Sequence, residues 1–206
     1  MLTLFHSPRS RSTRVIALLK ELDAIDQVQV RCVGIRRQDG SGGGVDSANP
    51  HPEGKVPLLL DGDTEVWESS AIFQHLADLF PEAGMNVAPG HPGRGAYLSW
   101  LAWYSGVMEP VFTFEAAGVS HPLLGATFRS RVEMEARLVG ALSRQPFLCG
   151  DRFTAADLLV HSPYAWFGKP GVGVIDDWVD RCVARPSVAF AADFDAAQVA
   201  AAADLG

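Results

Sequence analysis

Cysteine is scarce in this chain, and its few copies are poorly placed for metal or disulfide chemistry. The 206 residues contain three cysteines, Cys32, Cys149 and Cys182. Their odd number and wide spacing argue against a disulfide framework. No C-x-x-C motif occurs, so neither a redox dithiol nor a zinc knuckle is supported. We therefore expect a protein of the reducing cytoplasm that holds no metal.

The sequence also lacks the features of membrane and nucleic-acid-binding proteins. No apolar run approaches the roughly 18 residues that span a bilayer. The N-terminus has neither a basic region nor the long apolar stretch of a secretion signal. With 24 acidic and 17 basic residues the formal net charge is -7, and no basic stripe stands out. These absences predict a soluble protein that binds neither membranes nor nucleic acid.

The first part of the chain alternates between strand and helix patterns. Residues 2–6 form a short apolar run, and a helix is expected to start around 10–12, with apolar side chains at helical spacing. Residues 28–35 alternate as a second strand, which completes a strand–helix–strand unit typical of a parallel crossover. The glycine-rich segment 38–44 has neither spacing of a phosphate-binding loop, so we interpret it as a flap.

A proline interrupts the next strand pattern, Gly54-Lys55-Val56-Pro57-Leu58-Leu59-Leu60. Proline cannot donate a hydrogen bond to a β-ladder. A cis Val56–Pro57 bond would turn the backbone just before the strand and leave the Val56 amide and carbonyl unpaired. An extended, peptide-like ligand can pair with these two groups as an added strand would.

Glu68 and Ser69 then begin a helix. They follow a turn at Asp61-Gly62 and a short returning strand, 65–67. The free amides and the positive dipole end of a helix start suit a small carboxylate. Together with the turn at Pro57, this helix start outlines a site for a short peptide with a free carboxyl group.

The rest of the chain is expected to be helical. Residues 81–93 are rich in Gly and Pro and are predicted to link two domains. Thr154 and Asp157 have the spacing of a capping box, which we interpret as a folding device. The Ala-rich last helix has a weak apolar face, so we expect a loosely docked tail. The predicted helices span 95–108, 127–144, 174–183 and 189–203.

The order and spacing of these motifs resemble those of the cytosolic glutathione transferases, of a bacterial theta- or beta-like type. The resemblance implies an α/β plus all-α architecture. A thioredoxin-like glutathione-binding domain at 1–80 would be followed by a linker at 81–93 and an all-helical domain at 94–206. It further implies a homodimer, with glutathione as co-substrate. In such a site the residue before the cis-proline, Val56 before Pro57, pairs with the cysteinyl backbone, and Glu68 and Ser69 hold the γ-glutamyl end.

The residue that would activate the glutathione thiol has two candidates. A free thiol has a pKa of about 8.5, so a hydroxyl donor is needed to raise the thiolate fraction near neutral pH. In theta- and delta-like transferases the activating serine lies four residues before an arginine, and Arg14 places that role on Ser10. Alignment by the proline instead puts the beta-class cysteine position at Arg11, next to Ser12. The chain lacks that cysteine, and it lacks the tyrosine of the alpha, mu and pi classes.

Further residues would complete the site. Lys55 and His51 are candidates for the glycyl carboxylate, and Arg11 or Arg9 would add a cation near the thiolate. The resemblance implies an electrophile pocket between the domains, and the same aromatic spacing is also typical of a core. The pocket candidates are Trp103, Tyr104, Met108 and Phe112.

The resemblance implies an enzyme of detoxification in which glutathione thiolate attacks a small hydrophobic electrophile. Catalysis would come from thiolate stabilisation and proximity. Two alternatives stay open. One is a non-catalytic binding or regulatory protein on the same scaffold. The other is a glutathione-dependent oxidoreductase, which normally needs an active-site cysteine, and no cysteine lies near residues 9–13.

Overall fold

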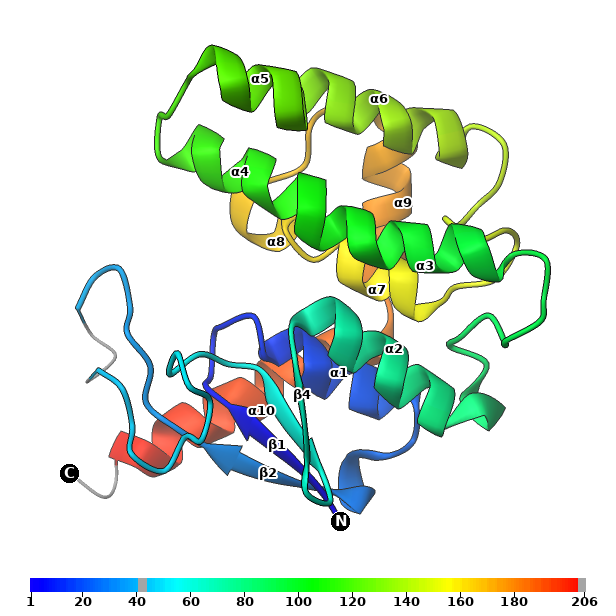
Figure 1. Ribbon diagram of the computed structural model, residues 1–206. Coiled ribbons are helices and arrows are strands. Elements are labelled where there is room, and N and C mark those ends of the chain that lie inside the picture. Colours follow the sequence, from blue (N-terminus) through cyan, green and yellow to red (C-terminus); the bar gives the residue numbers. More distant parts are fainter. Residues whose placement is uncertain (41–43, 204–206) are drawn as a thin grey trace. The chain divides into compact units, whose positions relative to one another are not determined.

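The computed structural model describes residues 1–40 and 44–203, so part of the predicted glycine-rich flap lies outside the described residues. The chain divides into two compact units. Unit 1 comprises Met1–Ala83 together with the residues from Arg185 onward, and unit 2 comprises Gly84–Ala184. Figure 1 labels their elements, and each unit is described by itself.

Unit 1 is built on a four-stranded sheet with the strand order β2-β1-β3-β4 (Figure 1). β1 pairs in parallel with β2 and antiparallel with β3, and β3 pairs antiparallel with β4. This mixed sheet with its helices is the predicted thioredoxin-like arrangement. The second strand ends earlier than predicted, at Cys32. The strands are β1 Leu2–His6, β2 Val28–Cys32, β3 Leu58–Asp61 and β4 Thr64–Trp67.

Two of the predicted amphipathic helices belong to this unit. They are α1, Thr13–Glu21, and α2, Ser69–Leu79. Most of the apolar residues that predict these helices are buried, because they recur on one face at helical spacing. In α1 and just beyond it they are Val15, Leu18, Leu19 and Leu22, and in α2 they are Ile72, Phe73 and Leu76. Leu79 at the end of α2, which the same pattern predicts to be buried, is 45 % exposed. Short 3₁₀ turns at Ile25–Gln27 and Pro81–Ala83 follow the two helices.

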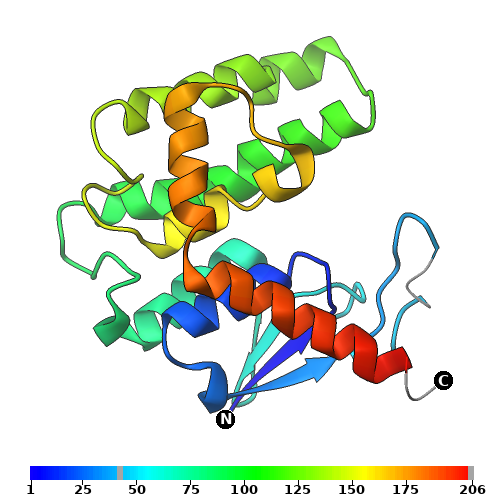
Figure 2. The same cartoon turned by 180° about the vertical axis from the view of Figure 1, so that it is seen from behind.

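The last helix, α10, Pro186–Ala203, lies along α1 (Figure 2). The structure therefore groups α10 with unit 1, whereas the sequence analysis places it in the helical domain 94–206. The expectation of a loosely docked tail is wrong. Polar contacts dock this helix where its apolar face is weak. Arg185 and Ser187 both donate to the Glu21 carboxylate, and Asp195 accepts from Thr13 at the start of α1 and from Arg9 in the loop before it.

Unit 2 is helical, as predicted. A π-helical segment, Tyr104–Met108, joins α3 to α4 without a break in the chain's helical course. The predicted helix 127–144 is two helices, because Arg129 adopts a positive φ of 67° and Ser130 starts a new capping box with Glu133. The helices are α3 Arg94–Trp103, α4 Glu109–Ala116, α5 Pro122–Phe128, α6 Arg131–Leu142, α7 Ala155–Val160, α8 Tyr164–Phe167 and α9 Gly173–Val183.

The predicted capping box opens α7, all of whose residues are buried. Asp157 Oδ2 accepts from the Thr154 amide and hydroxyl, both at 3.0 Å. Its other oxygen accepts from the Leu148 amide at 2.8 Å and from Trp178 Nε1 at 3.0 Å. Burial raises the pKa of Asp157, and these hydrogen bonds oppose that rise. The carboxylate thus ties α7 to α9 and to the preceding loop, as a folding device.

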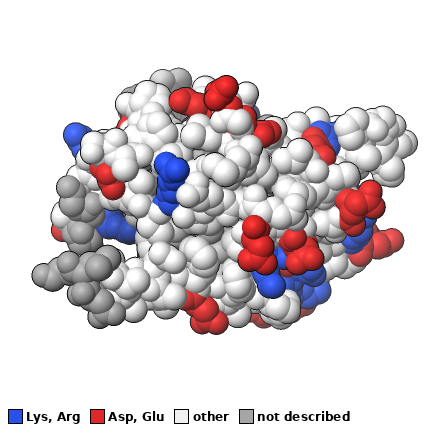
Figure 3. Space-filling model, turned by 90° about the horizontal axis from the view of Figure 1, so that it is seen from below, with Lys and Arg blue, Asp and Glu red and all other residues white. Residues whose placement is uncertain are grey.

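The surface carries mixed charge. On the face in Figure 3, Lys and Arg side chains are scattered among Asp and Glu side chains and form no continuous basic stripe. Among the helices of the described residues, none is long and apolar enough to cross a membrane.

Candidate functional site

The register of the sheet in unit 1 brings three chain segments to one end. Phe5, next to the last residue of β1, pairs with Leu58, the first residue of β3. Leu58 pairs in turn with Trp67, the last residue of β4. The loop after β1, the turn before β3 and the start of α2 after β4 therefore meet at the same end of the sheet (Figure 1). These are the three segments that carry the predicted glutathione and thiol-activating residues.

The Val56–Pro57 peptide is cis, which confirms the prediction from the interrupted strand. Pro57 is buried, and Val56 packs against the apolar cluster of Phe5, Val33 and Leu58. The Asn49 side-chain amide donates to the Lys55 carbonyl oxygen at 3.1 Å and supports the turn from the outside. The turn holds Val56 at the edge where an extended ligand would pair.

Glu68 and Ser69 form the start of α2, as predicted. Glu68 is exposed and adopts a positive φ of 69°, a conformation that costs a non-glycine residue about 1–3 kcal/mol and is common at ligand sites. Its carbonyl oxygen accepts the first helical bond from Ile72 at 3.0 Å. Ser69 is buried at the first helical position. The first-turn amides of α2 consequently face the end of the sheet, where they suit an anionic group.

The predicted cations lie near this helix start. The Lys55 ammonium contacts the Glu53 carboxylate. The hydrogen bond and charge of Glu53 raise the pKa of Lys55, Glu68 adds to the rise, and Arg11 opposes it. Lys55 is thus within electrostatic range of both Glu68 and Arg11. His51 shapes the turn just before Lys55, because its Nδ1 accepts from the Glu53 amide at 3.0 Å.

The two candidate serines occupy different environments in the loop after β1. Ser12 is 0 % exposed, and its hydroxyl lies 2.8 Å from His6 Nδ1 and accepts from the Ser7 amide at 3.0 Å. Ser10 is only partly buried. Its Oγ lies 2.8 Å from Ser12 Oγ and accepts from the Ser12 amide at 3.1 Å. Ser10 is therefore the hydroxyl that a ligand can reach, and Ser12 stands behind it.

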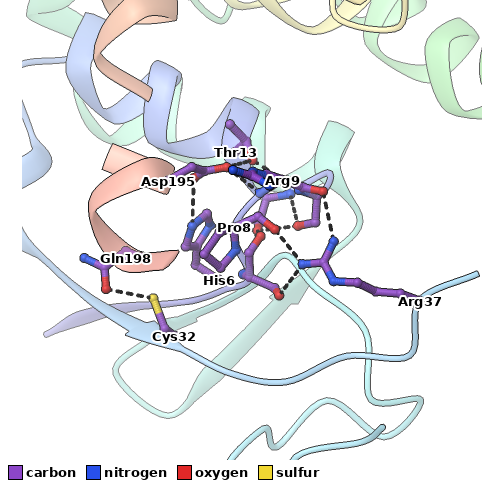
Figure 4. Close-up of polar contacts among 11 residues, drawn as sticks. His6, Pro8, Arg9, Thr13, Cys32, Arg37, Asp195 and Gln198 are labelled. Atoms are coloured by element: carbon purple, nitrogen blue, oxygen red, sulfur yellow. Dashed lines mark hydrogen bonds and ion pairs between the residues drawn. The ribbon is translucent and has the colours of Figure 1, made fainter. Parts of the chain in front are cut away.

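Two side chains that the sequence analysis does not identify hold this loop from opposite sides (Figure 4). Arg37, beyond β2, donates to Ser7 Oγ at 3.2 Å, to the Pro8 carbonyl at 2.6 Å and to the Arg9 carbonyl at 3.2 Å. Asp195, in α10, accepts from the Arg9 amide at 2.5 Å. Arg9 itself has a positive φ of 55°. The loop conformation depends on both supports.

Asp195 also contacts the two residues that flank the loop. Its Oδ2 accepts from the Thr13 hydroxyl at 2.6 Å, and its Oδ1 lies 3.0 Å from His6 Nε2. Among the described residues neither His6 Nε2 nor Asp195 Oδ1 has a partner with full hydrogen-bond geometry, so the two buried atoms have only this close contact with each other. Burial alone would raise the pKa of Asp195, but the bonds from His6, Thr13 and Arg9 outweigh burial and lower it. Asp195 is an ionised carboxylate paired with a buried imidazole.

The pocket candidates belong to α3, the π-helical segment and α4 of unit 2. Tyr104, Met108 and Phe112 are buried, and Trp103 is partly exposed. The Phe112 ring stacks on Phe167 with centroids 4.8 Å apart. These positions are as expected for a helix core, and their role toward an electrophile stays a prediction.

Comparison with known proteins identifies relatives that cover most of the chain. The family model described as "Glutathione S-transferase, N-terminal domain" matches residues 1–78. A glutathione S-transferase from Hyoscyamus muticus is 32% identical over 163 residues, which cover 73% of this chain and 74% of that protein.

Solved structures of glutathione transferases resemble this chain over nearly its full length. A glutathione transferase from Methylococcus capsulatus is 25% identical, with a TM-score of 0.76 over 95% of this chain and 99% of that one. The theta class glutathione S-transferase from Xanthomonas axonopodis, solved with glutathione bound, is 28% identical, with a TM-score of 0.69 over 91% of this chain and 94% of that one.

Proposed function

Because the chain belongs to the glutathione S-transferase family, we propose that it binds glutathione at the end of the unit 1 sheet and transfers its thiolate to a small hydrophobic electrophile. One observation carries this proposal. The strand register gathers at one end of the sheet the cis Val56–Pro57 turn, the Glu68–Ser69 helix start and the Ser10 loop. Backbone pairing at Val56 would hold the peptide, as an added strand does.

The charges of the site fit the ends of glutathione. The α-ammonium of the γ-glutamyl group would meet the exposed Glu68 carboxylate, and its α-carboxylate would meet the first amides of α2 at Ser69. Lys55 would contact the glycyl carboxylate, with Arg11 adding positive charge nearby. This orientation leaves the thiol pointing toward the loop that carries Ser10.

Thiolate stabilisation is the proposed role of Ser10. A hydroxyl that donates to the sulfur favours the charged form of the thiol and lowers its pKa. Ser12 is enclosed, so we assign it a supporting role behind Ser10. Trp103, the partly exposed member of the predicted pocket set, would contact the electrophile, and the reaction would gain mainly from proximity and orientation.

Calorimetric titration with glutathione, followed by a conjugation assay over a panel of apolar electrophiles, tests the proposal. Saturable binding with conjugation supports it. Binding without conjugation would favour a non-catalytic binding protein on the same scaffold. No binding at millimolar glutathione would remove the proposal altogether.

Trp103→Ala should raise the KM for the electrophile and leave the KM for glutathione unchanged.

An oxidoreductase mechanism is disfavoured by the state of the thiols. Burial and the charge of Asp195 raise the pKa of Cys32. Burial raises the pKa of Cys149 to about 11. A catalytic cysteine needs the opposite shift, because the thiolate is the nucleophile. Deglutathionylation that disappears in Cys32→Ser would reverse this conclusion.

We further propose a homodimer that works where glutathione is kept reduced, as in the cytoplasm. Trp67, at the end of β4 beside Glu68, is 56% exposed, and a large exposed aromatic is typical of an interaction surface. Size-exclusion chromatography with light scattering checks the assembly, and a monomer at all concentrations would rule out the dimer.

A further inference from the structure

Both oxygens of one carboxylate, Asp195 in α10, are connected to Ser10 through other side chains. Figure 4 shows the contacts of Asp195 with Thr13 and His6, from which the two paths start. Asp195 Oδ2 accepts from the Thr13 hydroxyl, and Thr13 Oγ1 accepts from the Ser10 amide at 3.2 Å. Asp195 Oδ1 lies against His6 Nε2, and the path continues through His6 Nδ1 and Ser12 Oγ to Ser10 Oγ. The first path fixes the Ser10 backbone, and the second connects its hydroxyl to a titratable ring.

The hydrogen-bond directions in the second path follow from its end at Asp195. An ionised carboxylate only accepts, so a proton sits on His6 Nε2. With a neutral ring, His6 Nδ1 is then an acceptor at 2.8 Å from Ser12 Oγ, closer than the Ser7 carbonyl at 3.2 Å, which is the other acceptor for the Ser12 proton. Ser12 donates its proton to the nearer acceptor, His6 Nδ1. Ser12 Oγ accepts in turn from Ser10. In this resting state the Ser10 proton points inward, and the outer lone pairs of Ser10 Oγ face the ligand side.

We propose that His6, held by Asp195, stores the proton that the glutathione thiol gives up on binding. This inference rests on the proposed function of Ser10. The thiol proton moves to Ser10 Oγ as the Ser10 proton moves to Ser12 Oγ and the Ser12 proton moves to His6 Nδ1. The S–H bond breaks and the Nδ1–H bond forms, with no net loss of protons. The products are a thiolate, an imidazolium and the carboxylate already present.

The same proton movement reverses the direction of every hydrogen bond along the path. Imidazolium Nδ1–H donates to Ser12, Ser12 donates to Ser10, and Ser10 is left donating to the thiolate. The hydroxyl thus becomes the stabilising donor through the same movement that ionises the thiol. A neutral His6 that keeps its proton arrangement would hold the Ser10 proton away from the sulfur.

His6 is shielded from solvent. His6 is 0 % exposed and Asp195 is 3 % exposed, so the transferred proton has no direct contact with solvent. The titratable and charged groups near the ring include Asp195 of α10, Cys32, which pairs with His6 from β2, and Arg37, whose guanidinium donates to Ser7 Oγ. The rings of Phe194 and His6 meet edge to face with centroids 5.8 Å apart. The Asp195 carboxylate contacts the ring directly, so it would lie beside the stored charge.

Counting protons on glutathione binding tests this inference with the intact protein. Calorimetry in buffers of different ionisation enthalpy gives the number of protons released, and ultraviolet absorbance of the thiolate gives the number of thiols ionised. S-methylglutathione, which has no thiol proton, supplies the background. We expect the wild type to form thiolate near pH 7 with close to zero protons released per thiolate, and a value of about one overturns the inference.

Two variants should restore proton release. In Asp195→Asn the new amide has the shape of the carboxylate but no charge to hold an imidazolium, and in His6→Gln there is no group to store the proton. Release should rise to about one proton per thiolate in each. Asp193→Asn, an exposed carboxylate on the same helix, should leave the count at the wild-type value. Circular dichroism checks that each variant is folded, and the wild-type count stands without them.

The outcomes separate this inference from the proposed function. If thiolate forms and a proton is released, the proposed function stands and the role of His6 as a proton store is wrong. Bound glutathione that stays a thiol removes the proton store and leaves binding. No saturable binding removes both. A purely structural role for Asp195 would change affinity or stability in Asp195→Asn and would not change the protons released per thiolate.

Discussion

The two sides of the candidate site are held in different ways. The side that would bind the ends of glutathione, from Val56 to Ser69, is supported by contacts near in sequence, such as the bond from Asn49 to the Lys55 carbonyl. The side that would meet the thiol, the loop Ser7–Ser12, is held by Arg37 and by Asp195, which is 186 residues from its partner Arg9. Under the proposed function, binding would therefore depend mainly on local structure, and the chemistry would depend on the docking of the C-terminal helix.

This difference makes the two functions separable. A change near Glu68 should weaken glutathione binding and leave the bound thiol normally ionised. A change in the loop or its supports should leave binding close to normal and alter the thiolate. The following substitutions test that separation.

Ser10→Ala has the largest expected effect. It removes the only hydroxyl in the pair Ser10–Ser12 that a ligand can reach. Loss of one preorganised donor to a developing anion lowers kcat by about 100-fold. Steady-state conjugation kinetics should show this fall with the KM for glutathione little changed. Ser10→Thr keeps a hydroxyl and should recover part of the rate. An unchanged kcat in Ser10→Ala would assign the activation to another group.

Glu68→Gln should affect the side of the site that would bind the ends of glutathione, and so weaken binding. The change keeps the side-chain shape and removes the charge that would meet the ligand ammonium. We expect glutathione to bind about 10-fold more weakly, because a charge-assisted hydrogen bond becomes a neutral one. The thiolate fraction of bound glutathione should not change. Glu65→Gln, an exposed carboxylate on β4, is the matched control. Equal weakening in both variants would indicate a general charge effect.

Arg37→Gln should, like other changes in the loop, lower kcat more than glutathione affinity, but by less than Ser10→Ala does. The guanidinium makes three hydrogen bonds to the loop, from Ser7 to Arg9, and Gln cannot replace all of them. Partial exposure moderates the loss, so we expect kcat to fall about threefold to tenfold, with glutathione affinity retained. The adjacent exposed Arg36→Gln should behave as the wild type. A loss confined to affinity would contradict the separation of the two sides.

Sequence reasoning succeeds where the signal is local. The cis turn at Pro57, the start of α2 at Ser69 and the Thr154–Asp157 capping box all follow from short motifs, and the structure confirms each. Periodicity likewise predicts the buried faces of α1 and α2. Because each of these features depends on a few residues close in sequence, it can be predicted without knowledge of long-range contacts.

Sequence reasoning fails where the partner is remote. His6 has a weak signal, as a polar residue at the end of an apolar strand. Asp195 has none, because one acid in an Ala-rich helix is indistinguishable from a solvated one. The break at Arg129 is missed for another reason. Ser130 and Glu133 do form a capping-box spacing, but the apolar periodicity runs on through it.

Glu21→Gln has the smallest expected effect on catalysis. Glu21 anchors the start of α10, since Arg185 Nε and the Ser187 hydroxyl both donate to its Oε1 at 2.6 Å. Because Arg185 is partly exposed, we expect the substitution to lower the free energy of unfolding by about 1 kcal/mol. The contacts of Asp195 lie further along α10, so kcat should change little. Exposed Glu82→Gln is the control.

The stability difference between Glu21→Gln and the wild type should depend on pH with a defined sign. Burial alone would raise the pKa of Glu21, but the bonds from Arg185 and Ser187 outweigh burial and lower it. A carboxyl with a lowered pKa in the fold binds fewer protons folded than unfolded. Its stabilisation is therefore full above the ordinary value of about 4.3 and disappears as the pH falls through the folded value. Denaturant unfolding at pH values on both sides measures this, and a difference that grows on acidification would contradict the assigned pairing.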